Sequence, residues 1–330
     1  MQRRSASAAA KVMVAVLAAV AGLAGCTRTG SDPAASRQHA GRQVAGALGP
    51  AGAGLAAIRR GLSHPGGRGP AYYLSLGDSL SRGVQPTATG QDTATPRGYA
   101  DRLATRLRAA IPRLRLVELG CSGETTTTML NGGICSYPAG SQLAQAVRFL
   151  RDHRGRTALV TIDIGGNDPN SCVIGARPDT IVGCLVSRVP QIERNLSAIL
   201  ARLRSAAGNR VLIVGMTYYV PELGLWRSGR TGRQIGLVTD AFAAGVNRML
   251  ALRYHRYGAE VADVFSAFRS RDFGPGGPAR ASRAAGPPPN VKAICSLTWM
   301  CAAPPRGPNE HANDAGYRLI AHAFWRAITG

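Results

Sequence analysis

From residue 71 onward, short apolar segments alternate with longer amphipathic ones. The short segments are rich in Val, Ile, Leu and Tyr and are followed by Gly or Ser, which is typical of buried strands that end in turns. They predict strands at residues 72–76, 114–119, 158–164, 211–214 and 261–265. The longer segments carry apolar residues three or four positions apart, the spacing of a helix that buries one face. They predict helices over residues 99–111, 141–150, 189–203, 231–256 and 315–328.

This alternation predicts an α/β domain over residues 71–330. Parallel strands are joined by helical crossovers, so helices cover both faces of the sheet. Strands buried on both faces are mostly apolar, as most of these segments are. Residues 269–290 are rich in Gly, Pro and Arg and predict a long exposed loop. Residues 26–70 lack apolar periodicity and predict a flexible Gly/Ala/Arg-rich tether.

The net charge of +22 comes almost entirely from arginine. A strongly basic chain can bind nucleic acid or an anionic membrane surface. Here the arginines are scattered singly among Ala, Gly and Leu, few aromatic residues lie among them, and no nucleic-acid-binding motif occurs. We therefore expect no nucleic-acid partner and attribute the charge to an Arg- and Ala-rich proteome.

The start of the chain has the features of an export signal. A basic stretch precedes an apolar run, residues 12–23, that is too short to predict a membrane span. The run ends in Leu23-Ala24-Gly25-Cys26, which resembles a bacterial lipoprotein signal, in which cleavage precedes a cysteine that becomes lipid-modified. We expect residues 1–25 to be this signal peptide and Cys26 to anchor the protein to the outer face of the plasma membrane. An ordinary secretory peptide cleaved nearby is the alternative.

The chain has seven cysteines, and setting Cys26 aside leaves six. An exported protein meets the oxidising surroundings in which disulfides persist. Six cysteines allow fifteen connectivities, and sequence alone does not choose among them. Their grouping along the chain favours three local bonds, Cys121–Cys135, Cys172–Cys184 and Cys295–Cys301. No Cys-x-x-Cys motif occurs, and we expect neither a metal site nor a cofactor.

Polar motifs follow three of the predicted strands. These are Gly77-Asp78-Ser79-Leu80, Ser122-Gly123-Glu124-Thr125 and Gly165-Gly166-Asn167-Asp168. Open α/β sheets place their ligands at the carboxyl ends of the strands. Near the C-terminus, His311 begins the segment His311-Ala312-Asn313-Asp314. A serine hydroxyl is a poor nucleophile until an imidazole takes its proton, so Ser79 and His311 are the candidate nucleophile and base.

These four motifs, in this order, resemble the SGNH/GDSL hydrolase family, which is named for its Ser, Gly, Asn and His positions. The resemblance covers about residues 71–330. It implies the SGNH hydrolase fold, a flavodoxin-like three-layer α/β/α sandwich whose central parallel sheet has the order 2-1-3-4-5, and ester hydrolysis through an acyl-enzyme. By the same resemblance, the backbone N–H groups of Ser79 and Gly123 and the side-chain amide of Asn167 form the oxyanion hole. Asp78 would orient the turn rather than react.

One position departs from the family pattern. The family usually has an aspartate three residues before the histidine, and this chain has Pro308 there. We therefore expect a Ser–His dyad whose imidazole is oriented by a backbone carbonyl from residues 299–308. A non-standard triad that uses Glu310 is the second arrangement, and a slow or inactive site is a third outcome.

Aromatic residues after the fourth strand are candidates for a substrate wall. Tyr218, Tyr219 and Trp226, with Trp299 opposite, would line the site, although the same residues would serve equally to pack the loop. The leading hypothesis is an exported, lipid-anchored, monomeric esterase or lipase acting on a small-molecule, lipid or glycan ester. A deacetylase of cell-envelope polysaccharide and a non-catalytic envelope-binding lipoprotein that kept the fold are the alternatives.

Overall fold

The computed structural model describes residues 55–56, 58–59, 62, 69–173, 180–284 and 286–330. The predicted signal peptide and Cys26 lie outside these residues. Within the predicted tether, Ile58 and Leu62 are buried in the core of the domain. Leu55 packs against the same core, and both Leu55 and Ile58 are helical. Packing therefore begins before residue 71, earlier than we predicted.

Five parallel strands form the central sheet, in the spatial order β4-β1-β5-β6-β7. Their bounds are β1 Ala71–Gly77, β4 Leu114–Glu118, β5 Thr157–Asp163, β6 Leu212–Met216 and β7 Glu260–Ala262. Numbered along the chain, these five strands have the order 2-1-3-4-5, which confirms the predicted flavodoxin-like topology. A separate antiparallel hairpin follows β1 and consists of β2 Gln85–Pro86 and β3 Asp92–Thr93.

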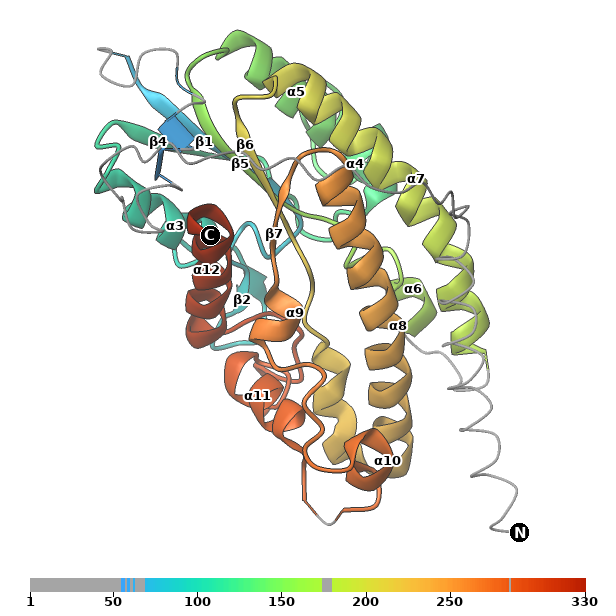
Figure 1. The fold of residues 1–330 in the computed structure, drawn as a ribbon. Coiled ribbons are helices and arrows are strands. Elements are labelled where there is room, and N and C mark those ends of the chain that lie inside the picture. The colour runs from blue at the N-terminus through green and yellow to red at the C-terminus, as the bar shows by residue number, and fades with distance from the viewer. Residues whose placement is uncertain (1–54, 57, 60–61, 63–68, 174–179, 285) are drawn as a thin grey trace, which may run out of the picture.

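Helices cover both faces of this sheet, giving the predicted three-layer α/β/α architecture (Figure 1). One layer consists of α3 Tyr99–Arg108, α9 Val264–Ala267, α11 Pro289–Leu297 and α12 Asp314–Thr329. The other consists of α4 Thr126–Asn131, α5 Gln142–Asp152, α7 Ile181–Ala207 and α8 Gly229–Arg256. Successive residues of β1 alternate between the layers, since Tyr73 packs in the first core and Leu74 in the second. The shorter elements are α6 Asn170–Val173, the 3₁₀ helix η1 Pro221–Ser228 and α10 Gly277–Ala281.

Local signals in the sequence account for several element boundaries. The side-chain oxygen of Ser141 accepts a hydrogen bond from the Ala144 N–H at 3.1 Å and so begins α5. The predicted strand at residues 261–265 is wrong in its second half. There the Asp263 carboxylate accepts the Ser266 N–H at 3.1 Å and begins α9 directly after β7.

Residues 269–290 are not the uniformly exposed loop that we predicted. They contain α10, and α11 begins within them. Phe273, Ala281 and Asn290 are buried. The Gly and Pro residues of this segment therefore separate short packed pieces of chain.

Three disulfides join the pairs that the grouping of the cysteines favoured, Cys121–Cys135, Cys172–Cys184 and Cys295–Cys301. Each closes a short loop, with sequence separations of 14, 12 and 6 residues. The first holds the loop after β4, the second joins α6 to α7, and the third holds the end of α11.

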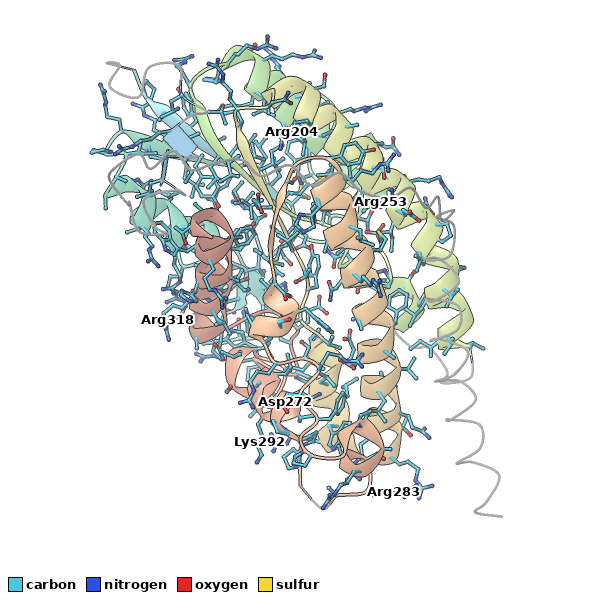
Figure 2. The ribbon with its side chains drawn as sticks, viewed as in Figure 1. Arg204, Arg253, Asp272, Arg283, Lys292 and Arg318 are labelled. Atoms are coloured by element: carbon cyan, nitrogen blue, oxygen red, sulfur yellow. A yellow bond between two sulfur atoms is a disulfide. The ribbon has the colours of Figure 1, made fainter. Side chains whose placement is uncertain are left out.

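The basic side chains lie on widely separated elements, as their scatter in the sequence predicts (Figure 2). Several satisfy backbone groups inside the domain. Arg204, near the end of α7, donates to the carbonyl oxygens of Tyr257 at 3.0 Å and Val211 at 2.9 Å. It thereby ties the end of α7 to the end of α8 and to the start of β6. Arg253 of α8 pairs with Glu193 of α7.

Helix α8 packs closely on the sheet through Gly215 of β6. A Cβ atom at this glycine would lie 2.2 Å from the ring of Tyr254, which is fully buried. By length and composition the helical stretch Pro221–Arg256 could span a membrane. Within this stretch, α8 packs against the rest of the domain and buries Phe242, Leu250 and Tyr254.

We expect Gly215→Ala to lower the free energy of unfolding by about 1–3 kcal/mol, because the added methyl group overlaps Tyr254. Gly183→Ala is the matched control, since Gly183 lies on exposed α7 surface with open space at its Cβ position. It should raise the free energy of unfolding by about 0.5–1 kcal/mol. Urea denaturation of both variants checks this, and a Gly215→Ala protein as stable as the wild type would contradict the packing.

Candidate active site

Ser79 and His311 meet at the carboxyl edge of the sheet. Ser79 lies in the turn after β1, and His311 lies in the loop before α12. The Ser79 Oγ and His311 Nε2 atoms are 2.9 Å apart, although the residues are separated by 232 positions in the chain. Both side chains are nearly buried, with 8% and 6% exposure. The structure thus brings together the two residues that the sequence analysis predicted as nucleophile and base.

The turn that carries Ser79 is fixed from below by Asp163, the last residue of β5. Gly77 has φ +137°, and a Cβ atom there would lie 2.3 Å from the Asp163 carbonyl oxygen, so only glycine fits. The Asp78 N–H donates to both the carbonyl and a carboxyl oxygen of Asp163, each at 3.2 Å. The Asp78 Oδ1 atom accepts the Leu80 N–H at 2.9 Å, which agrees with the turn-orienting role expected of Asp78.

Asp163 and Asp78 form a buried carboxyl pair. The Asp163 carboxyl is fully buried and accepts a hydrogen bond from the Tyr99 hydroxyl. Burial raises the pKa of Asp163 well above its ordinary value, and the neighbouring Asp78 raises it further. Burial also raises the pKa of Asp78. Burial and the closeness of the two carboxyls both favour the protonated form, so the pair beneath Ser79 is less readily ionised than two ordinary carboxyls.

Gln142, the first residue of α5, links the nucleophile turn to the Gly123 loop. Its Oε1 atom accepts the Gly77 N–H at 2.7 Å, and its Nε2 atom donates to the Gly77 carbonyl at 2.9 Å. The same Nε2 donates to Glu124 Oε2 at 2.9 Å. The sequence analysis assigned no role to Gln142, because its partners lie in two other segments of the chain.

The predicted oxyanion residues lie at adjacent strand ends. Gly123 has φ +79° and is exposed, and nothing lies within 4 Å of its Cβ position, so the backbone conformation explains the glycine here. Asn167 lines the same cavity as Ser79. Its Nδ2 atom donates to the Glu124 carbonyl at 3.0 Å, and its Oδ1 atom accepts from Asn170 at 2.9 Å. The side-chain amide of Asn167 is therefore held in one orientation against the Gly123 loop.

The groups that orient His311 are Asn309 and Asp92, which the sequence analysis missed. The His311 Nδ1 atom lies 2.9 Å from Asn309 Oδ1 and 3.5 Å from Asp92 Oδ2. The Asn309 Nδ2 atom donates in turn to Asp92 Oδ1 at 2.8 Å. With Nδ1 donating its proton to Asn309, the Nε2 atom presents its lone pair to Ser79.

The predictions for the histidine partner were therefore wrong in both forms. Neither a backbone carbonyl nor Glu310 accepts the Nδ1 proton, since the Asn309 amide oxygen occupies that position. Adjacent side chains point apart here, with His311 buried and Glu310 exposed. The Glu310 carbonyl instead accepts a hydrogen bond from the Tyr219 hydroxyl at 2.8 Å, and this contact fixes the loop just before His311.

Asp92 reaches the site because the β2–β3 hairpin packs against the loop that carries His311. At the hairpin tip, Gly90 has φ +85°, and a Cβ atom there would lie 2.2 Å from the Pro305 carbonyl oxygen. At the hairpin base, Gln85 accepts from Trp299 Nε1 at 3.2 Å and donates to Asp314 at 3.1 Å. The hairpin and the histidine loop therefore form one packed unit.

Burial lowers the pKa of His311 from its ordinary value of 6.5. The Asp92 carboxylate and, to a smaller extent, Glu310 act in the opposite direction and raise it, but they do not cancel the effect of burial. His311 is therefore neutral at pH 7, which is the form that can accept a proton from Ser79.

A cavity of about 120 Å³ opens beside Ser79 and His311. Tyr218 and Tyr219, two of the candidates for a substrate wall, line it. Trp226 and Trp299 do not, and their assignment to that wall was wrong. Trp226 is buried in the core beside Phe273, and Trp299 is held beneath the β2–β3 hairpin by its hydrogen bond to Gln85.

Tyr218 is fixed at both its backbone and its hydroxyl. Asn247 of α8 accepts the Tyr218 N–H and donates to the Tyr218 carbonyl, both at 2.8 Å. The hydroxyl donates to Asp78 Oδ2 at 2.9 Å. The ring covers Gly166, where a Cβ atom would lie 2.5 Å from the ring. This tyrosine therefore connects the cavity to the nucleophile turn.

In the part of the chain that the structure describes, no group of three or more His, Cys, Asp or Glu side chains could hold a metal ion.

Comparison with known sequences gives a family match. Residues 75–319 match the model of the GDSL-like Lipase/Acylhydrolase family. This range includes Ser79, Gly123, Asn167 and His311. No curated protein matches the sequence.

Comparison with solved structures finds several lipases and esterases, all at low identity. The lipase Lip_vut3 from a goat rumen metagenome is 17% identical, with 77% of this chain and 95% of that chain covered and a TM-score of 0.48. Phospholipase A1 from Streptomyces albidoflavus NA297 is 17% identical, with coverages of 76% and 95% and a TM-score of 0.47. The acetylxylan esterase Axe2 from Geobacillus stearothermophilus is 17% identical, with coverages of 78% and 94% and a TM-score of 0.45.

We expect an NMR titration to give a pKa for His311 below 6.5, because burial disfavours the charged imidazolium. Asp92→Asn removes a charge that raises this pKa, so the variant should titrate at still lower pH. Asp152→Asn, at the exposed end of α5, is the matched control and should leave the titration unchanged. A pKa that rises or stays constant in Asp92→Asn would show that Asp92 does not act on the imidazole.

Proposed function

Because the chain belongs to the GDSL-like Lipase/Acylhydrolase family, whose members are carboxylic ester hydrolases, we propose that it hydrolyses esters through an acyl-enzyme formed on Ser79. The observation that carries this proposal is the 2.9 Å contact between Ser79 Oγ and His311 Nε2 at the edge of a cavity. A nucleophile needs a base within hydrogen-bond reach, and this pair meets that requirement.

In the first half of the reaction, Ser79 Oγ attacks the carbonyl carbon of the ester while His311 Nε2 takes the hydroxyl proton. The electron pair of the carbonyl π bond moves to the oxygen and gives a tetrahedral oxyanion. Collapse of this intermediate breaks the bond to the alcohol oxygen, which leaves with the proton from His311. Water then attacks the acyl-enzyme by the same steps and releases the acid and Ser79.

Asn309 and Asp92 would act as positioning residues for His311. The Asn309 amide oxygen accepts the Nδ1 proton and so fixes the tautomer that presents Nε2 to Ser79. The Asp92 carboxylate, 3.5 Å from Nδ1, favours the imidazolium that forms when the proton is taken. Together they would orient the imidazole and stabilise its charged form, which is the role of the aspartate that the family usually has at the position of Pro308.

We propose that the oxyanion is bound by three donors, the backbone N–H groups of Ser79 and Gly123 and the side-chain amide of Asn167. The contact of Asn167 Nδ2 with the Glu124 carbonyl supports this, because it uses one amide proton and leaves the second for a ligand. The cavity position of Asn167 beside Ser79 supports it as well. Donors that are fixed before the reaction stabilise the oxyanion without reorganising.

The non-catalytic alternative was motivated by Pro308 alone. That reason no longer holds, because Asn309 and Asp92 contact His311 and orient its imidazole without an aspartate at position 308. A binding protein would have no use for a buried serine aligned with such a histidine. The enzymatic function is therefore the one that we propose.

We also propose that the protein acts outside the cytoplasm, with residues 1–25 as signal peptide, Cys26 as lipid anchor, a tether after it, and a monomeric hydrolase domain to residue 330. The three disulfides support an oxidising location. The burial of Ile58 and Leu62 shortens the free part of the tether.

A fluorophosphonate probe should label the wild-type protein at Ser79 and abolish its ester hydrolysis. Ser79→Ala should prevent labelling and lower kcat by at least about 10⁴-fold, since the nucleophile is lost. Ser266→Ala, an exposed serine in α9, is the matched control and should be labelled like the wild type. Absence of labelling and of turnover in folded wild-type protein would refute the proposed function.

Cys26→Ser should move the protein from the membrane fraction to the soluble fraction, because the lipid acceptor is removed. The measurement is fractionation of cells that express the full chain. The control is Ser31→Ala in the tether, which should stay with the membranes. Unchanged membrane association of Cys26→Ser would contradict the anchor.

A further inference from the structure

The cavity beside Ser79 has one apolar side, formed by the helices α7 and α8. Leu185 comes from α7, and Phe242, Ala243 and Val246 come from α8. Helix α8 also contributes Thr239 and Asn247, whose polar atoms are hydrogen-bonded to backbone groups. Ser79, Asn167 and His311 line the other side. An apolar wall with a few polar groups at one side is the usual form of a site that binds an aliphatic group next to a reacting atom.

The two sides of the cavity come from opposite layers of the fold. His311 precedes α12, which packs in the first helical layer, whereas α7 and α8 lie across the sheet in the second (Figure 1). The leaving alcohol oxygen receives its proton from His311, so the alcohol must lie on the His311 side. The acyl chain then extends toward Leu185, Phe242 and Val246.

The size of the cavity limits that chain. An engineered apolar cavity of about 150 Å³ in another protein holds benzene, which has six carbon atoms. This cavity has about 120 Å³ in all, part of which the ester group occupies, so about four to six carbons is the upper limit for an aliphatic chain that it holds.

The wall is supported from behind. Phe242 and Leu185 are buried, and they pack in one cluster with Ile181, Val189 and the Cys172–Cys184 disulfide. Close packing of this kind resists expansion, because moving one side chain displaces its neighbours.

We propose that this cavity is the acyl site and that it makes the protein selective for esters of short aliphatic acids, with Ala243 and Val246 setting the length limit. This inference rests on the proposed ester hydrolysis at Ser79. Each methylene group of the acyl chain that packs against the apolar wall should raise kcat/KM by about fourfold until the cavity is full. Longer chains gain no further burial there.

The test is kcat/KM for p-nitrophenyl esters from acetate to palmitate. We expect the maximum between butyrate and hexanoate and a value for palmitate at least about tenfold lower. Ala243→Leu fills the cavity and should lower the hexanoate-to-acetate ratio of kcat/KM by about tenfold. Val246→Ala enlarges it and should shift the maximum by one or two carbons toward longer chains. Ala244→Leu, one position along α8 and outside the cavity lining, should leave the profile unchanged.

The outcomes separate this inference from the function on which it rests. Active protein whose rates rise steadily to palmitate would overturn the acyl site, as would an unchanged profile in both Ala243→Leu and Val246→Ala with fluorophosphonate labelling intact. If Ala243→Leu does not fold, the dependence of kcat/KM on chain length in Val246→Ala alone tests the acyl site. Wild-type protein that hydrolyses none of the esters and takes no label overturns the proposed function itself, and the acyl site with it.

Discussion

The position of the nucleophile depends on a carboxyl group buried inside the sheet. A buried ionised carboxyl is strongly unfavourable unless it is hydrogen-bonded, and Asp163 accepts hydrogen bonds from the Tyr99 hydroxyl and the Asp78 N–H, while its raised pKa favours the neutral form. Gly77 is needed because any side chain there would overlap Asp163. The turn that presents Ser79 therefore has one conformation, set by an acceptor that cannot move without leaving polar groups unpaired in the core.

The base is held by a different part of the molecule, yet that part begins next to the nucleophile. The β2–β3 hairpin leaves the turn only a few residues after Ser79 and carries Asp92 to the loop of His311. Gly90 lets the hairpin tip meet Pro305, and Gln85 joins its base to Trp299 and Asp314. One segment thus fixes the serine at its start and the histidine at its end. This explains how a 2.9 Å contact is kept between residues 232 positions apart.

The sequence predicted the features that depend on local pattern or on strand order. Alternating strands and helices leave few parallel topologies, and the observed order is one of the commonest. Ser79 and His311 could be found because each lies in a recognisable motif. Asp92 could not, since its partner Asn309 is 217 positions away and nothing in the hairpin sequence marks it. Asp163 is the one charged residue of its strand, and this lone acid in a buried strand was the available signal. Trp226 and Trp299 show that aromatic residues near a site do not reveal which way they face.

Replacing a directly bonded carboxylate by an amide changes what the histidine can do. The Asn309 oxygen accepts the Nδ1 proton but carries no full charge, so it orients the ring without strongly favouring the imidazolium. The charge of Asp92 acts from 3.5 Å, and its side chain is partly exposed to water, which weakens its effect. Burial then dominates and keeps the pKa of His311 low. The imidazole therefore stays neutral, and able to accept a proton, down to a lower pH than an ordinary histidine. The same low pKa makes it a weaker base. Its catalytic power must then depend on the short contact with Ser79 and on fixed donors for the oxyanion, both of which the buried network beneath the turn supports.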